Sequence, residues 1–293
     1  MRILGIDLGG TNIKAGLCDD RGRILADTSI PTEAHLGRDH AIGRIIEAAR
    51  RVNKGATVCG IGVPGPLDLA RTVIYKAINL PGWVKVPLPR LLSKALKIPV
   101  IMENDANCAG VGEAVAGAGR GGDSVALFTL GTGIGGGLIL DGKLWIGANG
   151  GAGEFGHMVL DPRGPKCGCG QHGCLETLAS ATAVVRRYQQ LTGKDATARE
   201  ILAGRSPASR RVFAETVDAL GAGIATMLHI LHPKCVLLSG GMAAAPGLIA
   251  AVKSAVAKRV FPLYLRGLRI ARGTLGDDAG WLGAAQVAKE RTR

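Results

Sequence analysis

The sequence predicts an α/β fold made of two halves of related design. Along the 293 residues, short apolar segments alternate with longer amphipathic segments, which is typical of strands joined by crossover helices. Two segments also share one layout, in which a turn of Gly and Thr separates two apolar strands: ILGIDLGGTNIKAGL (residues 3–17) and ALFTLGTGIGGGLIL (residues 126–140). Because a single core rarely serves a chain of this length, we expect two domains, one of residues 1–118 with 278–293 and one of residues 119–277.

The first half begins with three expected strands, and the turns between them are marked by Gly9-Gly10 and by the polar run at residues 19–22. A helix and a further strand follow, and the motif Pro64-Gly65-Pro66 ends that strand. The strands are expected at residues 2–8, 12–19, 24–32, 57–63, 72–78 and 99–102, and the helices at residues 38–53, 87–96 and 106–118.

The second half restarts the pattern and is richer in helices. Its first strand leads into a glycine turn expected over residues 131–137, and a later apolar strand ends in Ser239-Gly240-Gly241. The strands are expected at residues 124–130, 138–140, 144–146, 235–238 and 268–271, and the helices at residues 175–192, 198–203, 207–231, 245–260 and 278–291.

Composition excludes several classes of protein. Apolar residues at 47% and charged residues at 20% exclude a disordered chain, and the 45 glycines follow no G-x-y period, which excludes a collagen-like rod. No apolar run approaches the ~18–20 residues that cross a bilayer, and the N-terminus lacks the features of a signal peptide. We therefore expect a cytoplasmic protein without a membrane partner.

The net charge of +13 raises the question of nucleic-acid binding. Residues 178–276 carry 14 Lys and Arg against 4 Asp and Glu, and this excess lies on segments with the pattern of amphipathic helices. No DNA- or RNA-binding motif accompanies it, and aromatic side chains for base stacking are scarce. We expect a solvated basic face, part of which attracts anionic substrates, and no specific nucleic-acid site.

The two glycine turns predict phosphate binding. Glycines let backbone N–H groups converge on one anion, and Thr11, Asn12 and Thr132 add side-chain donors. The chain contains no P-loop motif, and the G-x-G-x-x-G spacing from Gly131 to Gly136 precedes a hairpin pattern instead of the helix that a dinucleotide site requires. Plain hairpin turns are the alternative, which two matching turns in two half-chains disfavour.

A nucleoside triphosphate with a divalent cation fits these turns. Asp7, at the end of the first strand, is a candidate ligand of Mg²⁺, commonly through water. The third turn, Ser239-Gly240-Gly241, suits a nucleotide that lies against the backbone. The residues expected to contact ATP are Asp7, Gly9, Gly10, Thr11, Asn12, Lys14, Gly131, Thr132, Gly133, Gly135, Gly136, Gly240 and Gly241.

Three of the seven cysteines cluster with a histidine. The pattern H-x₉-C-x-C-x₄-C runs from His157 to Cys167, Cys169 and Cys174, and a closed Cys₃His set is typical of a structural zinc site. His172 is a rival for the fourth position, and unmetallated thiols are the alternative. The other four cysteines stand singly in apolar surroundings and are expected to be buried: Cys18, Cys59, Cys108 and Cys235.

DLGGTN (residues 7–12), LGTGIGGG (130–137) and LSGGMA (238–243) resemble the two phosphate motifs and the adenosine motif of the actin-like sugar kinases. The cysteine cluster narrows the resemblance to the ROK family of sugar kinases and their repressor relatives, and it spans essentially the whole chain. It implies a duplicated, actin-like and ribonuclease H-like ATPase fold with a cleft between two domains. It also implies that the zinc histidine is His157 and not His172.

The segment ENDAN (residues 103–107) stands between an expected strand and an expected helix and supplies a carboxylate for phosphoryl transfer. Asp105 is the candidate base that accepts the hydroxyl proton of the acceptor, with Asn104 able to bind sugar hydroxyls. The alternative role of Asp105 is to cap the helix. The resemblance implies the catalytic role. It also implies sugar contacts at Gly65, Asn79, Asn104, Glu154, His157 and Glu176.

We therefore expect an ATP-dependent hexokinase-type enzyme that phosphorylates the 6-hydroxyl of glucose, as a homodimer or a tetramer. GAGEFGHM (residues 151–158) resembles the glucose-using members, whereas CGCGQHGCLE (residues 167–176) also resembles N-acetylglucosamine kinases. N-acetylglucosamine, N-acetylmannosamine, mannose and fructose stay open as acceptors, and polyphosphate stays open as the donor. A sugar-responsive repressor needs a DNA-binding domain ahead of the kinase-like part, and here DLGGT begins at residue 7, which disfavours it.

Overall fold

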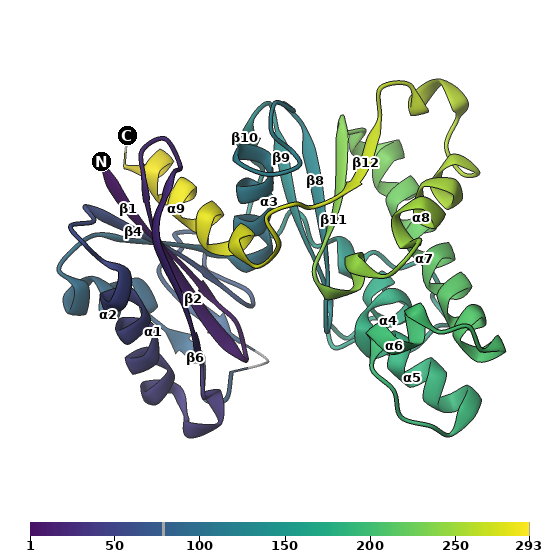
Figure 1. Cartoon of the computed structure of the whole chain (residues 1–293), viewed down its shortest axis with the longest axis horizontal. Coiled ribbons are helices and arrows are strands. Elements are labelled where there is room, and N and C mark those ends of the chain that lie inside the picture. Colours follow the sequence, from purple (N-terminus) through teal and green to yellow (C-terminus); the bar gives the residue numbers. More distant parts are fainter. Residues whose placement is uncertain (78–79, 293) are drawn as a thin grey trace.

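The computed structural model describes residues 1–77 and 80–292, and it contains two five-stranded sheets (Figure 1). In the first sheet the order is β3-β2-β1-β4-β7, and in the second it is β10-β9-β8-β11-β12. In both sheets the first three strands are antiparallel and the last two run parallel to the central strand. The same topology is built twice, so the prediction of two halves of related design is confirmed.

The strand bounds agree with most of the predicted segments. The first sheet consists of β1 (Arg2–Leu8), β2 (Asn12–Asp19), β3 (Ile24–Pro31), β4 (Val58–Val63) and β7 (Val100–Asn104). The second sheet consists of β8 (Val125–Leu130), β9 (Ile134–Leu140), β10 (Lys143–Leu144), β11 (Cys235–Ser239) and β12 (Arg269–Arg272). A separate pair is formed by β5 (Ile74–Lys76) and β6 (Val84–Val86), of which the sequence analysis missed β6.

The helices cover the two sheets. The first half carries α1 (Arg38–Val52), α2 (Leu88–Leu96) and α3 (Asp105–Val115). The second half carries α4 (Leu175–Ala179), α5 (Ala181–Thr192), α6 (Ala198–Ala203), α7 (Pro207–Leu231) and α8 (Leu248–Ala257), and the chain ends in α9 (Ala279–Arg291). Over the described residues, no helix combines the length and the apolar character needed to cross a bilayer.

Two of the predicted elements are wrong in part. The turn expected over residues 131–137 ends at Gly133, because Gly135, Gly136 and Gly137 belong to β9 and pair with β8. These glycines serve close packing: a side chain at Gly137 would lie 2.7 Å from the carbonyl oxygen of Ala106. The helix expected over residues 175–192 breaks at Ser180, whose side chain caps α5 by accepting from the Ala183 N–H.

The central strand of each sheet brings an equivalent residue to the same edge. Asp7 is the penultimate residue of β1, and Thr129 is the penultimate residue of β8. The next residue of each strand pairs with the start of the following hairpin strand, Leu8 with Ile13 and Leu130 with Ile134. The two predicted phosphate turns therefore occupy equivalent places in the two halves.

Helices α3 and α9 pack against each other between the two sheets (Figure 1). Helix α9 also lies across β1 and β4, whereas α3 also contacts β8 and β9. The two helices approach closely because glycines face backbone: a side chain at Gly283 of α9 would overlap the carbonyl oxygen of Cys108, and one at Gly112 of α3 would overlap that of Ala279. This contact joins the two halves.

One buried carboxylate holds both segments that cross between the halves. Glu113, in α3, is fully buried and accepts hydrogen bonds from the backbone N–H groups of Ala118, Thr274 and Leu275, at 2.8, 3.1 and 2.8 Å. Ala118 lies in the segment that leads to β8, and the other two residues lie in the segment that leads to α9. Both crossings are thus fixed at a single point.

Replacing Gly283 with alanine is expected to lower the free energy of unfolding by about 1–3 kcal/mol, because the new methyl group has no space against Cys108. The matched control is Gly43→Ala, an exposed glycine inside α1, where the added carbon would lie more than 4 Å from every described residue beyond its chain neighbours and the backbone of its own helix. That change is expected to stabilise by about 0.5–1 kcal/mol. Urea titrations of both variants measure the difference, and equal effects would contradict the packing argument.

Candidate active site

A cavity of about 450 Å³ opens where the two sheets face each other, and it collects residues of both halves. Asp7, Thr129 and Gly240 line it at the carboxyl ends of β1, β8 and β11, the edge at which α/β sheets bind ligands. The residues predicted to contact ATP that line this cavity are Asp7, Gly9, Asn12, Lys14, Gly240 and Gly241.

The second glycine turn lies beside a neighbouring cavity of about 350 Å³. Gly131 and Thr132 line it, and Gly241 lines both this cavity and the larger one, so the two adjoin. Gly10 and Thr11 are exposed at the tip of the first turn. Together the two cavities offer an extended space between the phosphate turns and the turn after β11.

Asp7 has the environment of a cation ligand. Burial raises the pKa of Asp7 to about 7, and the negative charge of Asp105 adds to the shift, which Lys14 opposes. Lys14 Nζ lies 2.5 Å from a carboxylate oxygen of Asp277, which faces the same cavity. A buried carboxylate near other carboxylates favours a bound cation, so the donor set fits Mg²⁺.

A smaller cavity of about 220 Å³ lies on the other side of Asp105. Of the predicted sugar contacts, Gly65, Asn104 and Glu154 line it. Asp105 and Ala106 line this cavity and the 450 Å³ cavity alike, so the two spaces meet at the start of α3. Gly135 and Gly136, predicted to contact ATP, also line the smaller cavity, and the predicted contact Asn79 lies outside the described residues.

The local fold leaves Asp105 available to a ligand. The helix is capped by Asn104, whose Oδ1 accepts hydrogen bonds from the N–H groups of Ala106 and Asn107 at 3.0 and 3.1 Å. One carboxylate oxygen of Asp105 accepts from the Ala106 N–H at 2.8 Å. Burial raises the pKa of Asp105 to about 6, and Glu154 adds to the shift while the Ala106 N–H opposes it. A carboxyl group of this pKa is a base at neutral pH.

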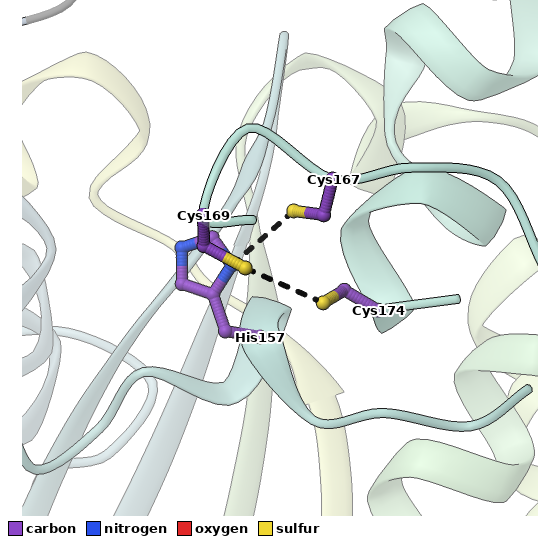
Figure 2. A group of neighbouring side chains, drawn as sticks. All are labelled: His157, Cys167, Cys169 and Cys174. Carbon is purple, nitrogen blue, oxygen red and sulfur yellow. Dashed lines mark hydrogen bonds between the residues drawn. The ribbon is translucent and has the colours of Figure 1, made fainter. Parts of the chain in front are cut away.

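The four predicted zinc ligands form one cluster (Figure 2). Cys169 Sγ lies 3.7 Å from Cys174 Sγ, Cys167 Sγ lies 3.6 Å from His157 Nδ1, and all four ligand atoms lie within 4.8 Å of one another. Tetrahedral zinc places two sulfurs about 3.8 Å apart and a sulfur and a nitrogen about 3.5 Å apart. The donor set and its spacing therefore fit zinc.

The loop around the cluster folds tightly. His172 points away from the ligands and its Nδ1 lies 3.1 Å from the carbonyl oxygen of Gly164. Gly173 has a positive φ of 64°, and a side chain there would overlap the carbonyl oxygen of Asp161. His157 Nε2 lies 3.9 Å from Glu154 Oε2, so the ring links the cluster to a wall of the 220 Å³ cavity.

The chain that follows Cys174 holds the second glycine turn in place. Glu176 Oε2 accepts from the Ile134 N–H at 2.9 Å, and Gly133 packs directly on the same carboxylate. The Ala181 N–H donates to the Gly131 carbonyl at 2.9 Å, and Thr182 Oγ1 donates to the Thr132 carbonyl at 2.8 Å. The loop that carries the cysteine cluster (residues 157–174, here called the zinc loop for its predicted ligands) and the second glycine turn are therefore one connected unit.

Comparison with known proteins gives the family. The family model described as "ROK family" matches residues 3–291. The chain belongs to the ROK family. Among ROK proteins, a glucokinase from Thermotoga maritima is 36% identical over 99% of this chain and 98% of that protein.

Two solved ROK structures have the same fold. A ROK hexokinase from Thermus thermophilus has a TM-score of 0.88 and 37% identity, with 100% of this chain and 99% of that one covered. A ROK glucokinase from Streptomyces griseus, solved with glucose and AMPPNP, has a TM-score of 0.86 and 31% identity, with 99% and 100% covered. The predictions of a ROK sugar kinase and of its actin-like fold are confirmed.

The sequence analysis missed several residues that line the 450 Å³ and 220 Å³ cavities. Arg272 and Asp277 line the 450 Å³ cavity, and Arg71 and Asn107 line the 220 Å³ cavity. Arg272 ends a parallel strand, and that position in the fold is the signal that could have found it. Nothing in the sequence around Arg71 distinguishes it from the other basic residues.

Proposed function

We propose that this ROK kinase transfers the γ-phosphoryl group of ATP to the 6-hydroxyl of glucose. The observation that carries the proposal is that Asp105 lines both the 450 Å³ cavity and the 220 Å³ cavity. A base that must touch the acceptor hydroxyl while the donor phosphate approaches belongs where the two spaces meet. The glucokinase relative and the glucose complex described above support glucose as the acceptor.

Each residue has a role that its surroundings support. Asp105 accepts the proton of the 6-hydroxyl, and Asn104 and Glu154 hydrogen-bond the other hydroxyls of the sugar. The backbone turns at Gly9 and Gly131 hold the phosphates of ATP, and the turn at Gly240 faces its nucleoside.

Two metal ions fit the site in different roles. Asp7 would hold Mg²⁺, which when bound neutralises the charge of the phosphates. Zinc would be held by His157 and the three clustered cysteines, and its role would be to keep the loop folded. With Nδ1 directed to the metal, the Nε2–H of His157 is free to donate to a sugar hydroxyl.

A coupled assay across hexoses and phosphoryl donors tests the proposal. Glucose with ATP is expected to give the highest kcat/KM among glucose, mannose, fructose, N-acetylglucosamine and N-acetylmannosamine. The same assay with ADP and with polyphosphate tests the donor. A higher kcat/KM for an N-acetylhexosamine would replace glucose as the acceptor, and no turnover of any sugar would contradict the proposal.

The pH dependence of kcat/KM is expected to follow the ionisation of the Asp105 carboxyl group. The base works in its ionised form, so kcat/KM should be constant above the pKa of about 6 and fall about tenfold per pH unit below it. Burial holds this pKa up and the Glu154 carboxylate adds to the shift, whereas the hydrogen bond from the Ala106 N–H opposes it. An activity that stays constant down to pH 5 at saturating Mg²⁺ would contradict the assignment of the base.

The remaining expectations stay proposals. We propose a cytoplasmic homo-oligomer whose domains consist of residues 1–118 with 278–293 and of residues 119–277. An exposed apolar group at the end of α7 and in the segment after α8 supports self-association: Ile230, Phe261, Leu263 and Tyr264. The rings of Phe261 and Tyr264 lie edge to face at 5.8 Å. Analytical ultracentrifugation measures the oligomeric state.

A further inference from the structure

Arg71 lies in the wall of the 220 Å³ cavity, here called the acceptor cavity because the proposed function places the sugar there, and its side chain is almost fully buried. It belongs to the loop between β4 and β5, and its backbone has a positive φ of 57°. An arginine in this conformation is strained, and such strain persists where the surroundings hold the residue for a reason. The contacts of its guanidinium group supply that reason.

The guanidinium group reaches parts of the acceptor cavity that belong to both halves. Arg71 Nε donates to Glu103 Oε2 at 3.1 Å, on the strand that ends in Asn104. Arg71 Nη2 approaches the carbonyl oxygen of Gly150 at 3.5 Å, on the loop of the second half that leads to Glu154. A side chain at Gly150 would lie 2.6 Å from Arg71 Nη1, so backbone and guanidinium are in close contact.

Glu103, which binds Arg71, also contacts the N-terminal end of α3, where the sugar is proposed to bind. Its Oε1 accepts from the Asn104 N–H at 2.9 Å and from Asn107 Nδ2 at 3.1 Å. Its Oε2 accepts from Arg71 and, at 2.8 Å, from Arg291 Nη2 of the last helix. The Glu103 side chain is 1% exposed, and Glu103 is not among the described residues that line the 220 Å³ cavity, so it acts on the cavity through its neighbours.

We propose that Arg71 is a positioning residue for the sugar. Held by Glu103, it fixes the distance between the loop after β4 and the loop that carries Gly150, and so sets the walls of the acceptor cavity around Asn104 and Glu154. The inference rests on the proposed function, because it assigns the sugar to this cavity. Arg71 does not line the 450 Å³ cavity, so its effect is confined to the acceptor.

The two arginines on Glu103 provide a matched pair of variants. Arg71→Met leaves Arg291 beside the Glu103 carboxylate, so the buried charge keeps one partner. Arg291→Met leaves Arg71 in place and removes a side chain that lies on α9, outside the acceptor cavity. A role in stability alone would lower the thermal stability of either variant and leave its KM for glucose at the wild-type value.

Steady-state kinetics with glucose and ATP test the proposal. Arg71→Met is expected to raise KM for glucose about tenfold or more, with KM for ATP within about twofold of wild type. Arg291→Met is expected to keep both constants within about twofold. The proposal is overturned if the two variants have equal KM for glucose, or if Arg71→Met raises KM for ATP by the same factor.

Arg71→Lys keeps the experiment decisive if Arg71→Met does not fold. Lysine keeps a positive charge near Glu103, but it lacks the planar guanidinium group that donates hydrogen bonds to Glu103 and to the Gly150 carbonyl at the same time. KM for glucose is therefore expected to rise severalfold, and a wild-type value would overturn the proposal.

Calorimetric titration of the wild type and the Arg71 variants with the hexose panel separates this inference from the proposed function. If the wild type phosphorylates no hexose, the proposed function fails, and weaker binding by the Arg71 variants still supports the role of Arg71. Equal binding by wild type and variants overturns the inference alone. A wild type that binds no hexose overturns both.

Discussion

Replacing Asp105 with asparagine is expected to lower kcat by roughly 10²–10⁴-fold, the range that a positioned general base contributes. Asparagine has nearly the same shape, and its side-chain oxygen can still accept from the Ala106 N–H. The cap of α3 also stays, because Asn104 supplies it. Glucose affinity is therefore expected to stay within about threefold of wild type, as measured by isothermal titration calorimetry beside a coupled assay for kcat.

The control for this variant is Asp39→Asn, which removes an exposed carboxylate at the start of α1 that lines neither cavity. It is expected to have wild-type kinetics. Turnover of Asp105→Asn within tenfold of wild type would show that another group accepts the proton. A loss of glucose binding equal to the loss of kcat would show that Asp105 acts through affinity.

Replacing Cys174 with serine is expected to remove zinc and to lower kcat/KM for both glucose and ATP by roughly tenfold or more. The effect on glucose follows from the link between His157 and Glu154. The effect on ATP follows from the segment after Cys174, which holds the backbone of Gly131, Thr132 and Ile134. Because zinc binding contributes to folding, the midpoint of thermal unfolding should fall as well.

Metal analysis and kinetics measure this outcome together. Wild type is expected to contain one zinc ion per chain, and prolonged chelation should reproduce the defects of the variant. The control is Cys235→Ala, which removes a buried thiol of the second sheet outside the cluster and should keep zinc. A zinc-free protein with a wild-type KM for ATP would contradict the coupling between the zinc loop and the phosphate turn.

Local patterns predicted the regular parts of the fold. The apolar segments gave the strands of both sheets, and the repeated strand, turn and strand layout gave the duplication. The spacing of the histidine and the three cysteines predicted that they form one cluster, since a tight loop that turns at glycines leaves few other arrangements. Asn104 and Asp105 are site candidates because they form a polar pair between a strand and a helix, and their roles stay predictions.

Contacts between distant segments could not be predicted in this way. Gly135 and Gly136 have the composition of a turn, but they lie in β9 and pair with β8. They are glycines because Thr129 and Phe155 occupy the space that side chains would need. Glu176 was expected to face the sugar, and its bond to the Ile134 N–H depends on a segment 42 residues away. The role of Arg71 depends on Glu103 and Gly150, which are remote from it in sequence.

Asp7 and Thr129 occupy equivalent positions in the two halves but carry different side chains, and this difference makes the two halves of the duplicated fold functionally unequal. A repeated unit offers every functional position twice, and symmetric copies would treat the two ends of a bound triphosphate alike. Here one copy presents a carboxylate, whereas the other presents a hydroxyl that accepts from the Gly135 N–H at 3.1 Å. A second carboxylate would repel the phosphates of the proposed nucleotide, so this difference at one pair of positions would leave a single place for the proposed Mg²⁺ and would distinguish the reacting end of the nucleotide from the other.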